Sequence, residues 1–121
     1  MKIVISSTGL TMDSQVDQRF GRCRYFCLYD TDSREYSVID NTARSASGGA
    51  GIQSAQAAAE TGATTVLTGN LGPNAWQALQ AAKMTVITGV TGSVSEAIEK
   101  FSKGEYSSAD KPTVRSHFGL K

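Results

Sequence analysis

Several residue types that would point to a particular protein class are scarce in this chain. Its 121 residues include two cysteines, one histidine and two prolines, and no apolar run approaches the length of a transmembrane helix. Lys and Arg total 12 and Asp and Glu total 11, so the net charge is +1 and no excess of one sign indicates a nucleic-acid or membrane surface. Without a signal-peptide pattern at its start, the chain is expected in the cytoplasm.

The two cysteines, Cys23 and Cys27, are too few for a disulfide framework and indicate a reducing compartment. If both lie on one strand, their Cα atoms are about 13 Å apart at about 3.3 Å per residue. At that distance they can neither pair with each other nor share one metal ion. Structural thiols are therefore favoured over ligands of an ordinary iron–sulfur site, which requires four such residues.

The hydrophobic pattern predicts one α/β domain over residues 1–104, followed by a loose tail over residues 105–121. Helices are expected from the glycine-rich stretch at residue 48 to Gly62, where glycine provides a left-handed cap, and over residues 73–83 and 93–104. Ser93 and Glu96 have the spacing of a capping box for the last helix. Buried strands are expected at 2–6, 24–30, 36–40, 63–68 and 84–88.

This element order predicts a five-stranded mixed sheet flanked by three helices. Right-handed crossovers place the first strand centrally, with a hairpin on one side and the last two strands on the other. The predicted strand order is 3-2-1-4-5, with strand 2 antiparallel to the rest. About 17 residues of loop follow the first strand, and a connection of that length in a small domain is usually functional or mobile.

The stretch from Ser45 to Ala59 combines three glycines with the start of an alanine-rich helix. Gly48, Gly49 and Gly51 can turn several N–H groups toward one point, and the helix start adds its own donors, an arrangement that suits an anion. It is neither a P-loop nor a GxGxxG motif, so no nucleotide is expected. Taken alone, the stretch fits a plain glycine-rich helix entry better than a binding loop.

The predicted topology favours a binding role for this stretch, because it would bring four glycine-containing loops together at one edge of the sheet. Together they would form a cleft rich in hydrogen-bond donors and poor in carboxylates, which favours an anionic ligand. The candidate binding residues are Ser7, Thr8, Gly9, Met12, Arg19, Phe20, Gly21, Arg22, Cys23, Ser47, Gly48, Gly49, Gly51, Asn70, Leu71, Gly72 and Asn74.

Four blocks in order resemble the dinitrogenase iron-molybdenum cofactor biosynthesis family, which includes small proteins of the NifX and NafY type. The blocks are KIVISSTG, RFGRCRYF, NTARSASGGAGIQSAQ and GNLGPNAWQAL, and the resemblance extends to about Gly104. It implies a ribonuclease-H-like fold and binding of iron–sulfur or iron–molybdenum–sulfur clusters. Single-domain members in sulfate reducers, called orange protein, are similar in size and hold a molybdenum–copper sulfide cluster without a covalent link.

The chain departs from the family pattern at two points. Some carriers are thought to use a histidine near the cleft, whereas the single histidine here, His117, falls in the tail. Many relatives have alanine–proline where this chain has Cys23 and Arg24, so Cys23 is a candidate thiolate ligand, with a structural thiol as the alternative. The predicted function is a non-enzymatic carrier for an anionic metal–sulfur cluster, acting as a monomer or weak dimer with a cluster donor or acceptor protein.

Two alternatives stay open. One is a regulatory or scaffold domain that binds a protein partner at the same edge without a cofactor. The other is a metal-dependent nuclease, which would need several carboxylates on the central strands. The first strand offers only Ile3, Val4 and Ile5 at its centre, so the nuclease is disfavoured.

Overall fold

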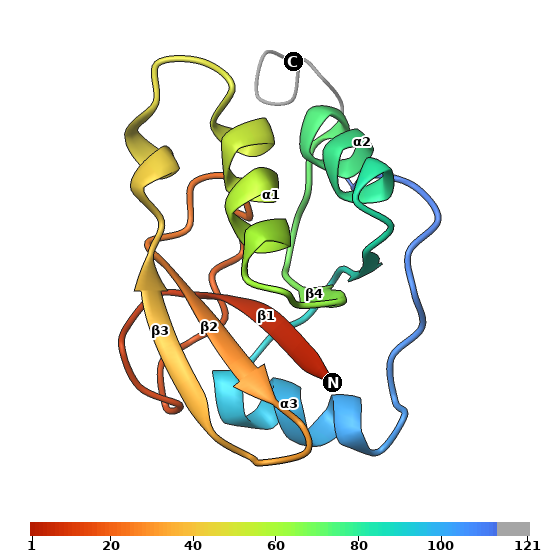
Figure 1. The fold of residues 1–121 in the computed structure, drawn as a ribbon. Coiled ribbons are helices and arrows are strands. Elements are labelled where there is room, and N and C mark those ends of the chain that lie inside the picture. The colour runs from red at the N-terminus through yellow and green to blue at the C-terminus, as the bar shows by residue number, and fades with distance from the viewer. Residues whose placement is uncertain (114–121) are drawn as a thin grey trace.

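The computed structural model describes residues 1–113 and shows an α/β domain built around one mixed sheet (Figure 1). The strands run in the order β3-β2-β1-β4-β5, with β2 antiparallel to β1 and β3, and with β1, β4 and β5 parallel. This confirms the predicted order and strand directions, and it is compatible with a ribonuclease-H-like fold. The elements are β1 (Lys2–Ser7), β2 (Tyr25–Asp30), β3 (Tyr36–Asp40), the 3-10 helix η1 (Thr42–Ser45), α1 (Ala50–Glu60), β4 (Thr65–Leu67), α2 (Pro73–Ala81), β5 (Thr85–Ile87) and α3 (Val94–Ser102).

The helices form a layer on each face of the sheet, with α1 and α2 on one face and α3 on the other (Figure 1). Strand β1 shows the division, because Val4 belongs to the core under α1 and α2, whereas Ile3 and Ile5 belong to the core under α3. A buried strand alternates its side chains between two apolar faces. The β-branched run at the start of the chain is therefore the centre of the fold.

The inward faces of α1 and α2 consist mostly of small residues. The buried residues of α1 are Ala50, Ser54, Ala55 and Ala58, whereas Ile52 is 39% exposed. In α2 the buried residues are Ala75 and Leu79, while Ala82 is exposed. A helix made mostly of alanine has little hydrophobic contrast around its circumference, so periodicity alone does not decide which face turns inward.

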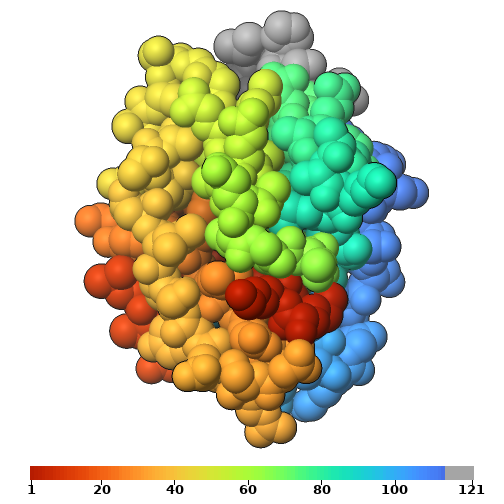
Figure 2. Space-filling model, viewed as in Figure 1, coloured from red at the N-terminus to blue at the C-terminus, as the bar shows by residue number. Residues whose placement is uncertain are grey.

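Residues 105–113 lie against the domain, in a stretch for which the sequence pattern predicted only a loose tail. The Ala109 N–H donates to the Val86 carbonyl at 2.7 Å, and Tyr106 packs on the core beneath α3. In Figure 2 this blue segment covers the side of the molecule beyond α2. The stretch lacks periodicity because it runs along the edge of the sheet as an extended strap. His117 lies outside the described residues.

No helix within residues 1–113 combines the length and the apolar character that a membrane crossing requires.

Candidate functional site

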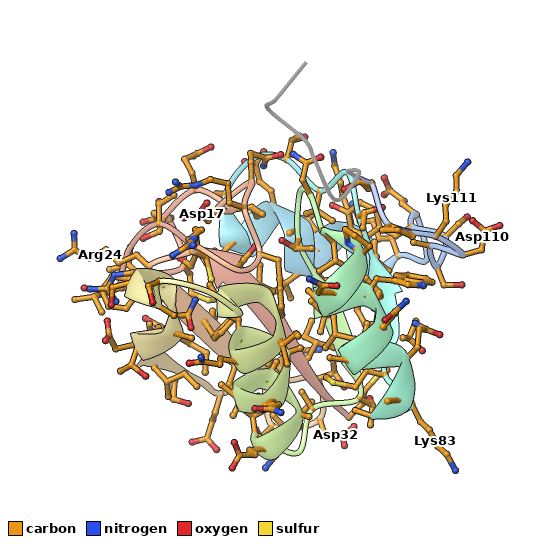
Figure 3. All side chains as sticks on the ribbon, turned by 90° about the horizontal axis from the view of Figure 1, so that it is seen from above. Asp17, Arg24, Asp32, Lys83, Asp110 and Lys111 are labelled. Atoms are coloured by element: carbon orange, nitrogen blue, oxygen red, sulfur yellow. The ribbon has the colours of Figure 1, made fainter. Side chains whose placement is uncertain are left out.

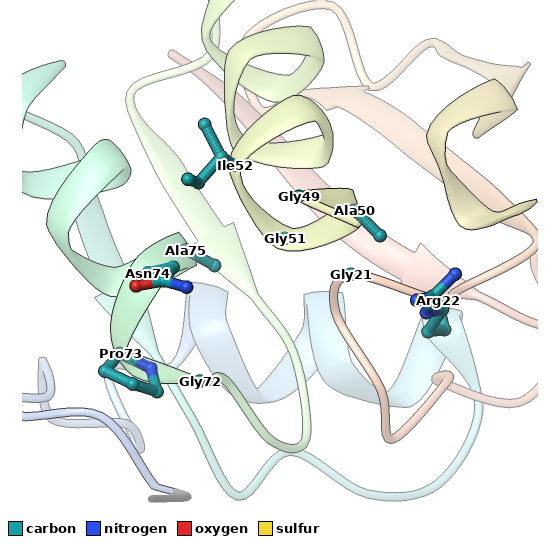
Figure 4. Close-up of a pocket in the computed structure, with 10 residues that line it drawn as sticks. All are labelled: Gly21, Arg22, Gly49, Ala50, Gly51, Ile52, Gly72, Pro73, Asn74 and Ala75. Carbon is teal, nitrogen blue, oxygen red and sulfur yellow. The ribbon is translucent and has the colours of Figure 1, made fainter. Parts of the chain in front are cut away.

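A cleft lies where the first turns of α1 and α2 meet the loop that precedes β2 (Figure 4). It consists of two adjoining hollows of about 260 Å³ each, which share Gly21, Arg22 and Gly72. The first hollow is also lined by Gly49, Ala50, Gly51, Ile52, Pro73, Asn74 and Ala75, and the second by Arg19, Phe20, Asn70 and Leu71. Three loops from different parts of the sequence thus converge at the carboxyl edge of the parallel strands.

The two helix N-termini at the cleft have no side-chain cap. Gly49 precedes α1 with φ of +72°, a left-handed conformation that glycine adopts without strain, and Gly72 precedes α2. Neither Gly49 nor Gly72 makes a side-chain capping hydrogen bond to the first N–H groups of its helix. Because the first N–H groups of a helix have no intrahelical acceptor, both helices offer unpaired donors and the positive ends of their dipoles here.

Glycines allow the three segments of the cleft to approach one another closely. A Cβ at Gly21 would lie 3.0 Å from the Gly51 Cα, and a Cβ at Gly51 would lie 3.3 Å from the Ala75 Cβ. Both distances are tighter than most real Cβ contacts, and the neighbour of Gly21 is backbone, which cannot turn away. Glycine at these two positions therefore sets the spacing between the β2 loop, α1 and α2.

Buried polar side chains hold the Gly21 loop from behind. The Ser54 hydroxyl on α1 donates to the Gly21 carbonyl at 3.0 Å, and the Asn41 amide donates to the Cys23 carbonyl at 2.9 Å. Ser54 also contacts the Asn41 Oδ1 at 3.2 Å, and both side chains are buried. Sequence reasoning missed this network, although a serine at an inward position of an alanine-rich helix was a signal for it.

Cations border the cleft, and no carboxylate is among its described lining residues. The Arg22 Nη1 donates to the carbonyls of Arg44 and Ala46 at 2.6 and 2.8 Å, which fixes this guanidinium at one end of the cleft, where Figure 4 shows it. The side chain of Arg19 is 71% exposed, with its Nε 3.7 Å from an Asp17 carboxylate oxygen. Other charged groups, such as Arg24, Lys83 and Lys111, project from the periphery (Figure 3).

The candidate ligand Cys23 is buried among core residues, with no exposed surface. Burial raises the pKa of its thiol to about 12, and the negative charge of Asp17 adds to this effect, while a hydrogen bond from Asn41 opposes it. The thiol is therefore protonated at neutral pH, whereas metal ligation requires the thiolate. Within residues 1–113 no three His, Cys, Asp or Glu side chains come together in a way that could hold a metal ion.

Four of the expected binding residues lie in the loop after β1 and are not among the described lining residues of these two hollows: Ser7, Thr8, Gly9 and Met12. The carbonyls of Met12 and Ser14 instead accept hydrogen bonds from the first N–H groups of α3. These hydrogen bonds hold the loop after β1 against the N-terminus of α3. Ser47 and Gly48 are exposed and lie just before the part of the α1 entry that lines the cleft.

Comparison with known protein families finds one match that spans most of the chain. The family model described as dinitrogenase iron-molybdenum cofactor matches residues 1–104. Among curated proteins, the uncharacterized protein MJ0580 of Methanocaldococcus jannaschii is 28% identical over 109 residues, which cover 87% of this chain and 92% of that protein.

Two solved structures are similar to this one along nearly their whole length. The apo form of the orange protein from Desulfovibrio gigas has 36% identity and a TM-score of 0.91, covering 93% of this chain and 96% of that chain. The NMR structure of TM1290 from Thermotoga, which carries a provisional NifB designation, has 34% identity and a TM-score of 0.82, covering 93% and 97%.

Proposed function

The chain belongs to the dinitrogenase iron-molybdenum cofactor family, and we propose that it is a non-enzymatic carrier whose cleft holds an anionic metal–sulfur cluster. One observation carries the proposal. Two helices from different parts of the sequence direct uncapped N-termini into the same hollow, and its described lining contains no carboxylate. Such an arrangement favours an anion, because both helix dipoles and the open N–H groups act in the same direction.

The chemistry of a sulfide-rich cluster matches the cleft in two respects. Its sulfurs accept hydrogen bonds and carry negative charge, which suits the N–H groups of Gly51 and Asn74 and the guanidinium of Arg19. Its soft surface also suits the apolar wall formed by Phe20 and Leu71, both of which line the cleft. A molybdenum–copper sulfide or an iron–molybdenum–sulfur cluster is the proposed cargo, held without a covalent bond to Cys23.

Anaerobic titration of the protein with tetrathiomolybdate and copper(I) tests the proposal. We expect stoichiometric charge-transfer absorption that saturates at a fixed ratio of metal to protein. The informative variant is Asn74→Asp, because position 74 lies in the first turn of α2. The new carboxylate stabilises the helix by about 0.3–1 kcal/mol through the dipole, yet it repels an anion in the cleft. Stability should therefore rise while affinity falls.

A matched control places the same charge elsewhere. Gln80→Glu adds a carboxylate to the exposed end of the same helix, two turns from the cleft, and should leave the affinity unchanged. If Asn74→Asp binds as tightly as the parent, the cleft is not the site. If the parent shows no saturable absorption with either this reagent pair or an isolated cofactor, the carrier function itself is wrong.

A further inference from the structure

The two edge strands of the sheet, β3 and β5, differ in how they are covered. Strand β5 has three residues, and the Ala109 N–H of the strap donates to its Val86 carbonyl at 2.7 Å. Strand β3 has five residues and forms the outer margin of the sheet (Figure 1), and within residues 1–113 no backbone hydrogen bond is made on its outer side. Because an open edge is a template for another strand, we propose that β3 pairs, edge to edge and antiparallel, with the β3 of a second copy of this chain. This pairing needs no ligand and goes beyond the proposed function.

The hydrogen bonds at the two ends of β3 decide which of its backbone groups face outward. The Asn41 N–H donates to the Arg24 carbonyl at 3.0 Å, and the Asp30 N–H donates to the Glu35 carbonyl at 3.0 Å. In an antiparallel pair every second residue exchanges hydrogen bonds with the neighbouring strand. Alternate residues from Glu35 to Asn41 are therefore bonded to β2. The residues whose N–H and carbonyl groups point away from the sheet are Tyr36, Val38 and Asp40.

A two-fold axis at Val38 matches these outward groups to those of a second copy. Antiparallel pairing about this axis places Val38 opposite Val38 of the second copy, and Tyr36 of each copy opposite Asp40 of the other. Every outward N–H of one copy then has an outward carbonyl of the other copy as its acceptor. Such an interface uses the same surface of both copies, as in most homodimers.

The charges along this edge permit the pairing. Asp40 is the single charged residue within β3, and the Arg44 Nη1 donates to its carboxylate at 2.8 Å, so this charge is already balanced. Glu35 precedes β3 and Arg44 follows it, in η1. Antiparallel pairing brings Glu35 of each copy toward Arg44 of the other, whereas parallel pairing would place like charges together. The strand also has no proline or lysine, residues that commonly protect an open edge.

Side chains on the face of β3 that carries Ile39 complement one another across the same axis. Ile39 is 37% exposed, which leaves much of an apolar side chain in contact with water. A hollow of about 320 Å³ lies beside Ser37 and is also lined by Leu28. In the proposed register Ile39 of the second copy lies opposite Ser37, next to this hollow. Each copy thus covers apolar surface of the other, which stabilises the paired strands.

Sedimentation velocity of the ligand-free protein tests the pairing. A contact along one strand edge is small, so we expect a reversible dimer with a dissociation constant on the order of 100 µM, visible between about 10 µM and about 1 mM protein. Ile39→Glu should raise this constant at least about tenfold, because it removes the apolar contact and places a carboxylate near Glu35 of the second copy. The matched control is Ile52→Glu on α1, at a position 39% exposed, which should leave the constant unchanged.

Amide hydrogen exchange measured by NMR locates the contact. Raising the protein concentration should slow the exchange of the Tyr36, Val38 and Asp40 N–H groups, whereas those of Ser37 and Ile39, already bonded to β2, should not respond. A dimer that leaves the three outward amides unchanged, or that Ile39→Glu does not weaken, would use another surface and would overturn the proposal. A monomer at every concentration would also overturn it and leave the edge to a strand of a different protein. Each of these results leaves the carrier function to be decided by the cluster titration.

Discussion

The helix starts of this domain fall into two kinds, and the contrast between them supports the proposed site. At α3, the Ser93 hydroxyl accepts from the Glu96 N–H at 3.1 Å, and the Glu96 carboxylate accepts from the Ser93 N–H at 2.9 Å. The next two N–H groups, of Val94 and Ser95, donate to loop carbonyls. The hydrogen bond from the Ser93 backbone also holds the pKa of Glu96 below its usual value. This helix start is closed.

At α1 and α2 the corresponding positions are Gly49 and Gly72, which have no side chain to serve as a cap. A serine or aspartate cap stabilises a helix by about 1 kcal/mol, so the protein forgoes this contribution twice at one cleft. The difference teaches that the α3 start is closed by the protein's own groups, whereas the starts of α1 and α2 keep donors that a ligand could use. Under the proposed function, the α3 start supports the fold and the other two support binding.

The largest expected effect comes from filling the contact between the two open helices. Gly51→Val would drive methyl groups into Ala75, whose Cβ already lies within 3.3 Å of a Cβ built at position 51. We expect the free energy of unfolding to fall by about 1–3 kcal/mol through overpacking, and cluster binding to be lost. Urea denaturation and the absorption titration measure the two effects.

Gly48→Ala is the matched control for this variant, because nothing lies within 4 Å of a Cβ at position 48. Its stability should change by no more than about 0.5 kcal/mol, and its binding should be unaffected. Equal losses in both variants would mean that the glycine-rich stretch serves flexibility and not the close approach of α1 to α2.

An intermediate effect is expected at the closed helix. Ser93→Ala removes the capping hydroxyl of α3 and should lower the free energy of unfolding by about 1 kcal/mol. Cluster affinity should stay at the parental value, because α3 packs on the opposite face of the sheet. A loss of affinity comparable to that of Asn74→Asp would show that the two kinds of helix start are not functionally separate.

The smallest effect on stability at neutral pH is expected from the two buried thiols, Cys23 and Cys27. Burial raises the pKa of Cys23 to about 12 and that of Cys27 to about 11, from 9.0 in an unburied thiol. Above pH 9 the unfolded chain therefore loses protons that the native state keeps, and this favours unfolding. Stability should be constant up to about pH 8 and decline progressively toward pH 11.

Urea midpoints across this pH range measure the decline, and Cys23→Ala with Cys27→Ala should flatten it. Native protein at pH 8 should also react with a thiol reagent far more slowly than unfolded protein. Rapid reaction of Cys23 would show that its thiol faces the cleft and would restore it as a candidate metal ligand.

Most of the fold could be predicted from the sequence pattern. A β-branched run at residues 2–6, the hairpin pattern of the next two strands and the Ser93–Glu96 spacing were each sufficient to place an element, because each depends on local chemistry. The same pattern placed Gly21, Gly49, Gly51 and Gly72 at one cleft, since parallel strands send their following loops to the same edge.

The local sequence pattern could not predict hydrogen bonds in which several distant groups compete for the same donor or acceptor. The carbonyls of Met12 and Ser14, in the loop after β1, accept hydrogen bonds from the start of α3. Arg22 lines the cleft, and its Nη1 is bonded to the carbonyls of Arg44 and Ala46. Neither outcome has a signal in the spacing of residues, because both partners are distant in sequence.

By itself, the sequence determined the order of strands and helices and the small number of carboxylates near the glycine-rich loops. Those properties follow from composition and from the short-range geometry of the backbone. Only the tertiary structure decided that Cys23 is buried, that α1 and α2 have no side-chain cap while α3 has one, and that the Thr113 N–H donates to the Leu71 carbonyl. Burial and hydrogen-bond competition are properties of the packed chain, since they depend on segments that meet only after folding.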